Sequence, residues 1–144
     1  MDTTIPDILT LLPQRPPFIC VDRLTRCDGP ESETVFTIPE DHVFCRNGRY
    51  TEAGLMETVA QTCAARIGYL NLMQHDTIKL GIIGAVRNFI IHALPEAGTC
   101  LTTRITVKSE VFAITLVDAV VTADGRPVAG CEMKISLTDI VSTP

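Results

Sequence analysis

The sequence lacks the features that would assign it to a membrane, secreted or nucleic-acid-binding class of protein. No stretch reaches the roughly 18 uncharged apolar residues of a membrane-spanning helix. Residues 1–4 carry neither the basic nor the apolar region of a signal peptide. The formal net charge is −5, whereas a nucleic-acid-binding domain usually needs a basic face. We therefore expect a cytoplasmic protein with no membrane or nucleic-acid partner.

The sequence also lacks a C-x-x-C pair, although it contains 6 cysteines. Because the cysteines are scattered and most have apolar neighbours, we expect reduced thiols, and we predict no metal site. A chain of 144 residues fits one domain, so we assign residues 1–144 to a single domain. The cysteines are Cys20, Cys27, Cys45, Cys63, Cys100 and Cys131.

The first third of the chain predicts one short helix and two strands. Ile5 to Leu12 is amphipathic over a few residues and is closed by a proline. Residues 18–25 and 34–38 have the composition of strands, and the Asp28-Gly29-Pro30 turn between them predicts a hairpin. Residues 39–50 show no clear period, so we expect a loop there. Loops that lead into a helix often carry functional sites.

A long apolar segment then predicts a buried helix. From Ala53 to Met73 the only charged residues are Glu57 and Arg66, so a helix here would be apolar nearly all round. Such a helix is normally surrounded by other structure. Thr51 is the expected N-cap residue of this helix.

The second half of the chain predicts only strands. Residues 80–91 form an apolar run interrupted by glycines, and residues 101–108 alternate between apolar and polar side chains. Residues 112–122 and 127–137 flank Asp124-Gly125, which is a strong hairpin signal. The order of elements predicts an α+β hot-dog fold, in which an antiparallel sheet wraps around one long central helix. The strand at 80–91 would leave an open apolar edge, so we expect a dimer or a larger oligomer.

Glu57 is the first candidate for a functional residue. A carboxylate inside an apolar helix costs several kcal/mol unless it is paired, and sites that tolerate this cost are often functional. Two structural alternatives stay open: Glu57 lies at the helix surface, or it pairs with Arg15, Arg46 or Arg66.

Three segments carry a resemblance to a known family. Residues 11–23 read LLPQRPPFICVDR, residues 57–61 read ETVAQ and residues 124–133 read DGRPVAGCEM. They resemble the motifs L-L-P-H-R-x-P-F-L-x-x-D-R, E-A-x-A-Q and D-G-x-x-V-A-x-A-x-L. These motifs occur in this order in the hot-dog-fold 3-hydroxyacyl-acyl-carrier-protein dehydratases of fatty acid synthesis. The resemblance covers the whole chain.

The resemblance implies a reaction and a set of site residues. In these dehydratases a helix carboxylate and a histidine from the partner subunit's loop remove water from an acyl thioester, which lies in a tunnel at the dimer interface. The helix N-terminus polarises the thioester carbonyl, so no cofactor is needed. By this resemblance Glu57 is the carboxylate and Gln61 a supporting residue, while Gly54 and Leu55 bind substrate. Gly54 alternatively permits close packing of the helix.

The chain departs from the family at the histidine. Counted back from Glu57 without gaps, Val43 occupies the position of the family's catalytic histidine. His42 is one residue away, and a loop shift would bring it into place; alternatively it is a solvated histidine beside Asp41. Gln14 replaces a histidine of the first motif, and we expect this difference to affect packing.

More distantly, the pattern of a glutamate without the histidine is similar to the dehydratase-like proteins of bacterial aryl-polyene clusters, where a degenerate hot-dog chain accompanies a complete one. The strand residues 80–87 and the turn at residues 95–98 also suit that branch better than the fatty acid branch. Three functions follow: a dehydratase that uses Glu57 with His42 or a water, a non-catalytic or half-catalytic partner of an intact dehydratase, and a hot-dog acyl thioesterase. The resemblance implies an acyl carrier protein or acyl-coenzyme A as the thioester donor. Arg46 and Arg49 would form a basic rim that receives an acidic carrier. Alternatively, these arginines are solvated or paired with carboxylates.

Overall fold

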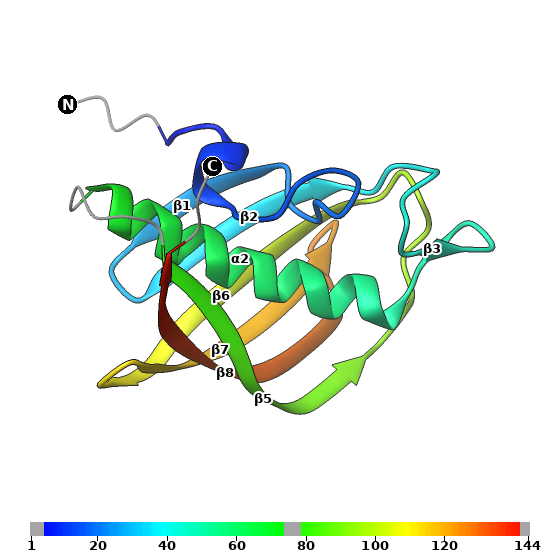
Figure 1. The fold of residues 1–144 in the computed structure, drawn as a ribbon. Coiled ribbons are helices and arrows are strands. Elements are labelled where there is room, and N and C mark those ends of the chain that lie inside the picture. Colours follow the sequence, from blue (N-terminus) through cyan, green and yellow to red (C-terminus); the bar gives the residue numbers. More distant parts are fainter. Residues whose placement is uncertain (1–4, 74–78, 142–144) are drawn as a thin grey trace.

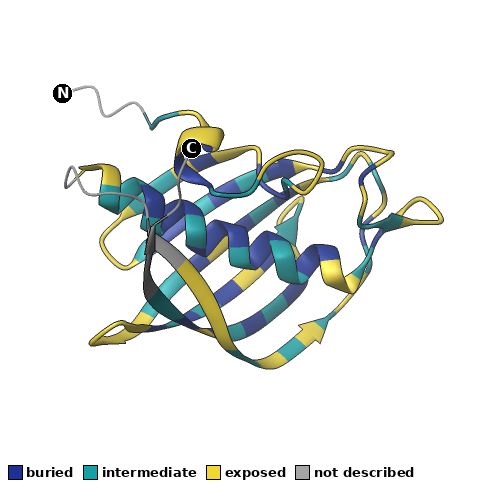
Figure 2. Ribbon diagram, viewed as in Figure 1, coloured by how far each residue is buried: buried dark blue, intermediate teal, exposed yellow. Residues whose placement is uncertain are grey.

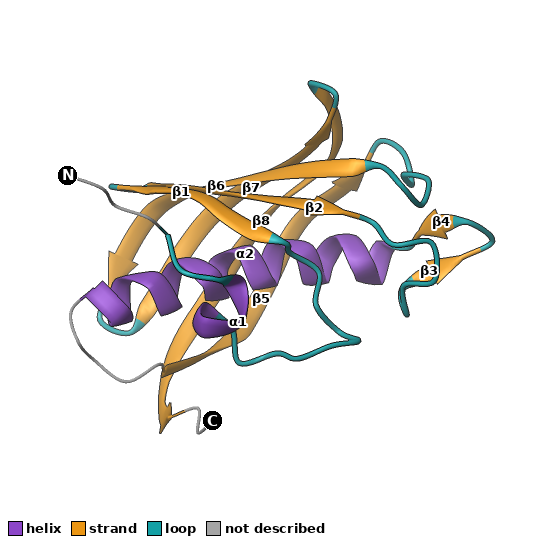
Figure 3. Cartoon of the chain, turned by 90° about the horizontal axis from the view of Figure 1, so that it is seen from above, coloured by secondary structure: helices purple, strands orange, loops and turns teal. Residues whose placement is uncertain are grey.

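The computed structural model describes residues 5–73 and 79–141. One antiparallel sheet curves around the long helix α2, as Figure 1 shows. The strand order in this sheet is β1-β2-β6-β7-β8-β5, and a separate two-stranded sheet pairs β3 with β4. Figure 3 shows the sheet and α2 as two layers, with α1 beside the helix. The elements are α1 (Ile8–Leu11), β1 (Arg23–Asp28), β2 (Glu31–Thr37), β3 (Cys45–Arg46), β4 (Arg49–Tyr50), α2 (Glu52–Met73), β5 (Lys79–Ile91), β6 (Cys100–Val111), β7 (Ile114–Ala123) and β8 (Arg126–Val141).

Helix α2 begins where the sequence predicts. The Thr51 hydroxyl accepts a hydrogen bond from the Gly54 N–H at 3.4 Å and donates one to the Phe44 carbonyl at 2.7 Å. Thr51 is therefore the N-cap residue and also ties the preceding loop to the helix. Figure 2 shows buried residues on several faces of α2, as expected for a helix enclosed by a sheet and by the N-terminal segment.

The main core lies between α2 and the concave face of the sheet. It includes Phe36, Leu101, Ile105 and Met133, which alternate with exposed or half-buried neighbours along their strands. A second cluster packs Ile8 and Leu11 of α1 against Ala65 of α2. The architecture agrees with the predicted antiparallel sheet around one central helix.

Two tight turns fix the hairpins. Asp124 and Gly125 both have positive φ angles, 51° and 76°, as a two-residue hairpin turn of the type I′ form requires. Asn47 and Gly48 have nearly the same pair of angles, 52° and 76°. The second turn joins β3 to β4 inside the segment that the sequence analysis treats as a loop, so that expectation was incomplete. The Asn-Gly pair was the signal that could have revealed it.

The first predicted strand was too long at its N-terminal end. β1 begins at Arg23 instead of Phe18, and residues 18–22 lie outside the sheet. The Phe18 and Ile19 carbonyls and the Cys20 N–H bind side chains, whereas the Asp22 N–H binds the Val35 carbonyl of β2 at 2.8 Å. The side-chain contacts of residues 18–20 matter for the site described below.

Strand β5 forms one edge of the sheet. It pairs with β8, and no other described strand covers its second side. Ile82, Ile83 and Ile90 on this strand are 54%, 40% and 56% exposed. The open apolar edge that the sequence predicts is therefore present, and the dimer inferred from it stays a prediction. Within residues 5–73 and 79–141, no helix has both the length and the hydropathy needed to cross a membrane.

Candidate active site

Glu57 lies in the second turn of α2, where its half-buried side chain faces a cavity of about 350 Å³. Most of the cavity wall is apolar. One wall is a stripe of the helix at positions 60, 63, 64 and 67, and the other is the start of β5 with one residue of β8. Glu57 is the only carboxylate among the lining residues, which are Gln14, Glu57, Ala60, Cys63, Ala64, Ile67, Gly81, Ile82, Ile83 and Ile135.

Gln61 fixes the position of Glu57 from one turn further along the helix. Its fully buried amide nitrogen donates to Glu57 Oε1 at 3.0 Å and to the Phe18 carbonyl at 2.8 Å. Its Oε1 accepts the Cys20 N–H at 2.7 Å. Because the Cys20 backbone must donate, the orientation of the Gln61 amide is determined, and its nitrogen necessarily faces Glu57. The supporting position assigned to Gln61 thus has a structural basis.

No arginine pairs with Glu57 within the described part of the chain. Arg15 donates to the Leu12 and Gln14 carbonyls at 2.7 and 2.8 Å. Arg66 lies 4.0 Å from Glu110. The alternative in which Glu57 belongs to an ion pair with Arg15, Arg46 or Arg66 is therefore wrong for the described residues.

His42 is a buried residue of the loop and only 8% exposed. Its Nδ1 accepts the Phe44 N–H at 3.1 Å, so the ring proton lies on Nε2, which donates to the Ile19 carbonyl at 2.7 Å. Aromatic rings surround it, with Phe36 and Tyr50 both at 5.6 Å between ring centroids. The alternative of a solvated histidine was wrong, because the His42 ring is buried and both of its nitrogens bind backbone groups of half-buried residues.

His42 and Glu57 lie on different sides of residues 18–20. The Ile19 carbonyl points to His42, whereas the Phe18 carbonyl and the Cys20 N–H point to Gln61. In an extended chain such groups alternate between the two sides. His42 lines a separate cavity of about 290 Å³ with Ile19, Phe36 and Val43. The described part of the chain therefore does not bring His42 to Glu57, and a catalytic role of His42 stays a prediction.

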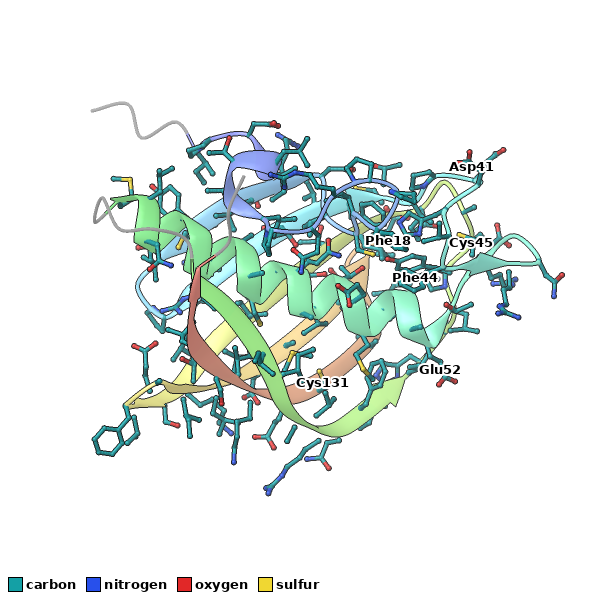
Figure 4. The ribbon with its side chains drawn as sticks, in the orientation of Figure 1. Phe18, Asp41, Phe44, Cys45, Glu52 and Cys131 are labelled. Atoms are coloured by element: carbon teal, nitrogen blue, oxygen red, sulfur yellow. The ribbon has the colours of Figure 1, made fainter. Side chains whose placement is uncertain are left out.

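The two neighbours of His42 point outward. Val43 is 47% exposed, and Asp41 is exposed as well. Figure 4 shows Asp41 pointing away from the body of the protein, on the loop that carries Phe44 and Cys45. The position at which the family resemblance expects a histidine is thus held by Val43, on the accessible side of the loop.

The helix N-terminus has little room for a substrate group. A Cβ atom on Gly54 would lie 2.5 Å from Cε1 of the buried Tyr50 ring. The Gly54 N–H binds the Thr51 hydroxyl, and the Leu55 N–H binds the Thr51 carbonyl at 3.0 Å. These contacts favour the alternative in which Gly54 permits close packing. Substrate binding by Gly54 and Leu55 stays a prediction.

No reactive thiol is available in the Glu57 cavity. Burial raises the pKa of the Cys63 thiol to about 12, so the lining cysteine stays protonated at neutral pH. Burial likewise raises the pKa of Cys20 to about 12. Among residues 5–73 and 79–141, no three histidine, cysteine or carboxylate side chains converge as a metal site requires.

The two arginines predicted to receive a carrier differ in their surroundings. Arg49 donates to the Leu94 carbonyl at 2.8 Å and lies 3.4 Å from Glu96. Glu40 and Glu96 line the same surface hollow as Arg49, so they offset its charge. Arg46 is exposed on β3. Binding of a carrier at these arginines stays a prediction.

Two contributions to the cavity were not predicted from the sequence. The helix stripe that begins at Glu57 continues through Ala60, Ala64 and Ile67, and helical periodicity could have found it. Gln14 also lines the cavity, although the sequence analysis expected it to affect packing only. The signal was its place in the first motif, where the family carries a different polar residue.

Comparisons with known proteins agree with this architecture. The sequence model of the ApeP-like family, described as ApeP dehydratase, matches residues 6–139. A search of curated proteins finds no match. The dehydratase heterocomplex ApeI:P from Xenorhabdus doucetiae is similar with a TM-score of 0.87 and 12% identity, over 93% of this chain and 92% of that chain.

Two other solved structures show the same fold at greater distance. The HP0420 homologue from Helicobacter felis has a TM-score of 0.72 and 10% identity, over 96% of this chain and 93% of that chain. A hypothetical thioesterase with coenzyme A from Streptococcus pneumoniae TIGR4 has a TM-score of 0.65 and 11% identity, over 81% and 84%. These similarities confirm the predicted hot-dog fold.

Proposed function

The chain belongs to the ApeP-like dehydratase family, and from this premise we propose that it is the carboxylate-bearing subunit of a heteromeric 3-hydroxyacyl-thioester dehydratase. The observation that carries the proposal is the placement of Glu57. Its carboxyl group faces an apolar cavity and is oriented by Gln61, while the nearest loop histidine, His42, has both nitrogens occupied on the other side of residues 18–20.

The chemistry needs one acid and one base. A histidine of the partner subunit takes a proton from the carbon next to the thioester carbonyl. Glu57 gives a proton to the 3-hydroxyl group, the C–O bond breaks, water leaves and a carbon–carbon double bond forms. Gln61 donates to Glu57 Oε1, so Oε2 is the oxygen that would hold the transferred proton.

A second copy of this chain would be a poor source of the base. Its loop presents Val43, which has no proton-accepting group, at the position of the family's histidine, and the exposed carboxylate of Asp41 points away from the body of the protein. Moving His42 outward would break its hydrogen bonds to the Ile19 carbonyl and the Phe44 N–H, both on half-buried residues, and each such loss costs about 0.5–1.5 kcal/mol. A different subunit with an intact histidine loop therefore suits this chain better. The similar structure from Xenorhabdus doucetiae is, by its name, a dehydratase heterocomplex.

Strand β5 is the proposed contact with that subunit. Its free edge offers unpaired backbone groups beside exposed isoleucines, which favour the addition of another strand. Gly81, Ile82 and Ile83 belong both to this edge and to the wall of the Glu57 cavity. A partner strand placed here would cover the cavity and bring its own loop towards Glu57.

The test asks whether Glu57 of this chain and the loop histidine of a partner subunit together form an active site. The partner is a hot-dog dehydratase from the same genome that has both a helix carboxylate and a loop histidine. Turnover of a 3-hydroxyacyl thioester is measured by the absorbance of the enoyl product. We expect no turnover by this chain alone. A partner whose own carboxylate is replaced by the amide should be inactive alone and active in the heteromer, because Glu57 supplies the missing group.

The remaining outcomes separate the alternative functions. If the heteromer depends on the partner's own carboxylate and tolerates Glu57→Gln, the chain is a non-catalytic partner subunit. If turnover by this chain alone depends on His42, the chain is a self-sufficient dehydratase. Release of a free thiol from an acyl thioester without dehydration would identify a thioesterase, the activity named for the Streptococcus pneumoniae protein.

A further inference from the structure

A narrow accessible stripe runs along one side of α2 and starts at Glu57. Between residues 57 and 68 four positions of the helix are half-buried, namely Glu57, Ala60, Ala64 and Ile67, and the other eight are buried. The same four residues line the cavity of about 350 Å³. Their spacing of three and four residues places them on one face of the helix. The surface that α2 leaves accessible in this stretch is therefore the wall of the cavity.

The wall that α2 gives to the cavity changes from polar to apolar along the helix. It begins with the carboxyl group of Glu57 and continues with the methyl groups of Ala60 and Ala64 and the protonated thiol of Cys63. Ten residues separate Glu57 from Ile67, which corresponds to about 15 Å along the helix axis. Because the side chains in between are small, this part of the cavity suits an unbranched hydrocarbon chain whose polar end lies at Glu57.

Ile67 meets the opposite wall of the cavity at Gly81. A Cβ atom on Gly81 would lie 3.3 Å from Ile67 Cδ1 and 3.1 Å from Ile135 Cγ2, and both distances are tighter than ordinary side-chain contacts. The close approach of β5 to α2 at this point therefore depends on the absence of a side chain at position 81. Ile67 also packs against the main core. At the end away from Glu57, its side chain thus spans the gap between the two walls.

We propose, on the basis of the proposed function, that Ile67 limits the length of the acyl chain that this subunit accepts. The reacting carbons lie at Glu57, and the acyl chain extends over Ala60 and Ala64 until its end meets Ile67. Because three backbone bonds of an extended chain span about 3.6 Å, roughly eight to ten carbons fit between Glu57 and the tip of Ile67. The substrate class is therefore straight-chain 3-hydroxyacyl thioesters of medium length.

Burial of methylene groups supplies the selectivity. Each extension by two carbons should tighten binding about tenfold as long as the added carbons contact the apolar wall. A carbon that reaches Ile67 must displace a side chain that is packed against the core, and such over-packing is destabilising. Affinity should therefore rise with chain length up to the limit and fall beyond it.

The experiment compares two variants that change the cavity in opposite directions. The heteromer contains a partner whose own carboxylate is replaced by the amide, so turnover reports on the Glu57 cavity, and kcat/KM is measured for a series of straight-chain 3-hydroxyacyl-coenzyme A thioesters. We expect Ile67→Ala to move the optimum to substrates about two carbons longer and to raise kcat/KM beyond the native limit about tenfold. Ala64→Leu, which narrows the cavity nearly one turn closer to Glu57, should move the optimum to substrates about four carbons shorter. Leu72→Ala, on the same helix but outside the cavity wall, is the control and should leave the length profile unchanged.

A binding measurement separates this inference from the proposed reaction. Saturated acyl-coenzyme A thioesters of the same lengths are titrated by calorimetry into the same heteromers, and the length profiles should shift as in turnover, because binding needs no chemistry. The partner's own cavity is identical in all samples, so differences between them report on this chain. Ala64→Leu removes no core contact, so it decides the question if Ile67→Ala fails to fold.

The outcomes distinguish the two proposals. Length profiles that neither variant moves, or an equal loss of affinity at every length, would overturn the inference about Ile67. If turnover nevertheless depends on Glu57, the proposed function stands without it. Shifted binding profiles without any turnover would contradict the proposed reaction and support the limit at Ile67.

Discussion

The side-chain amide of Gln61 donates to Glu57 Oε1 at 3.0 Å, one helical turn away on α2. The same amide holds the Phe18 carbonyl and the Cys20 N–H. One buried side chain therefore joins the N-terminal segment to the carboxylate. The position of Glu57 depends on residues 18–20 as well as on its own helix.

Glu57→Gln tests whether Glu57 contributes to catalysis or to the stability of the fold. The new amide can still accept the Gln61 N–H through its oxygen, so the unfolding free energy should change by less than about 0.5 kcal/mol. Loss of the acid should lower turnover of the heteromer by about 10²–10⁴-fold. Urea denaturation and enoyl absorbance measure the two effects. Glu52→Gln, at an exposed position of the same helix, is the control. A stability loss above about 2 kcal/mol would show that Glu57 is structural.

Gln61→Leu should destabilise the fold by about 1–3 kcal/mol, mainly because the buried Cys20 N–H loses its partner, whereas the carbonyl of the exposed Phe18 can bind water instead. Urea denaturation of the purified chain measures this loss. Gln14→Leu is the matched control, since it removes a glutamine whose Oε1 has no partner in the described part of the chain. Equal effects of the two substitutions would contradict the assigned roles.

Val43→His should create a base on the accessible side of the loop. Val43 is 47% exposed, and by the family resemblance it occupies the histidine position. If two copies of this chain can pair through β5, the variant alone should dehydrate a 3-hydroxyacyl thioester at least about 10²-fold faster than the parent chain. Asp41→His places a histidine on the same loop but pointing away from the body, and it should stay inactive. No gain from Val43→His would indicate that this loop does not face Glu57 of a second copy.

Arg46 and Arg49 should contribute unequally to carrier binding. Arg46→Glu should weaken binding of an acidic acyl carrier at low salt, and Arg49→Glu should weaken it less, because Glu96 already offsets the Arg49 charge. Added salt should weaken binding to the native chain as well, since exposed charges are screened beyond about 8–10 Å. Surface plasmon resonance measures both effects, with Arg104→Glu on β6 as the control. Unchanged carrier affinity, together with tight binding of acyl-coenzyme A, would assign the chain to coenzyme A thioesters.

The buried thiols predict how stability depends on pH. Burial raises the pKa of Cys20 and Cys63 from 9.0 to about 12 and that of Cys131 to about 11. Unfolded thiols ionise near their ordinary pKa, so above about pH 9 the unfolded state loses protons that the folded state keeps. The unfolding free energy should therefore be independent of these thiols below about pH 9 and should fall as the pH rises towards 11–12. Denaturation at a series of pH values measures this. Cys63→Ala should make the decrease of the unfolding free energy with pH smaller, whereas Cys100→Ala, at an exposed position, should leave it unchanged.

The sequence by itself determined the central helix, the long strands and their order, but not the short strands β3 and β4. The apolar run from Ala53 to Met73 could form only an enclosed helix, and Thr51 marked its start through a cap that depends on local geometry alone. Asp124-Gly125 determined the last hairpin, because few residues accept positive φ at both turn positions. Such signals act over a few residues and can be found in one chain. The same reasoning selected Glu57, since an isolated charge in an apolar helix is visible from its neighbours.

Only the tertiary structure decided what surrounds those residues. Gln61 meets Cys20 across 41 positions of sequence, and His42 meets Ile19 across 23, so no local pattern could show that both hold the same segment. The cavity exists because α2, the start of β5 and the N-terminal segment meet, so that Glu57 and Gln14 line the same space although 43 positions separate them in the sequence. The expectation that His42 is solvated failed for the same reason. Its burial depends on the rings of Phe36 and Tyr50, which come from different elements and meet only in the folded protein.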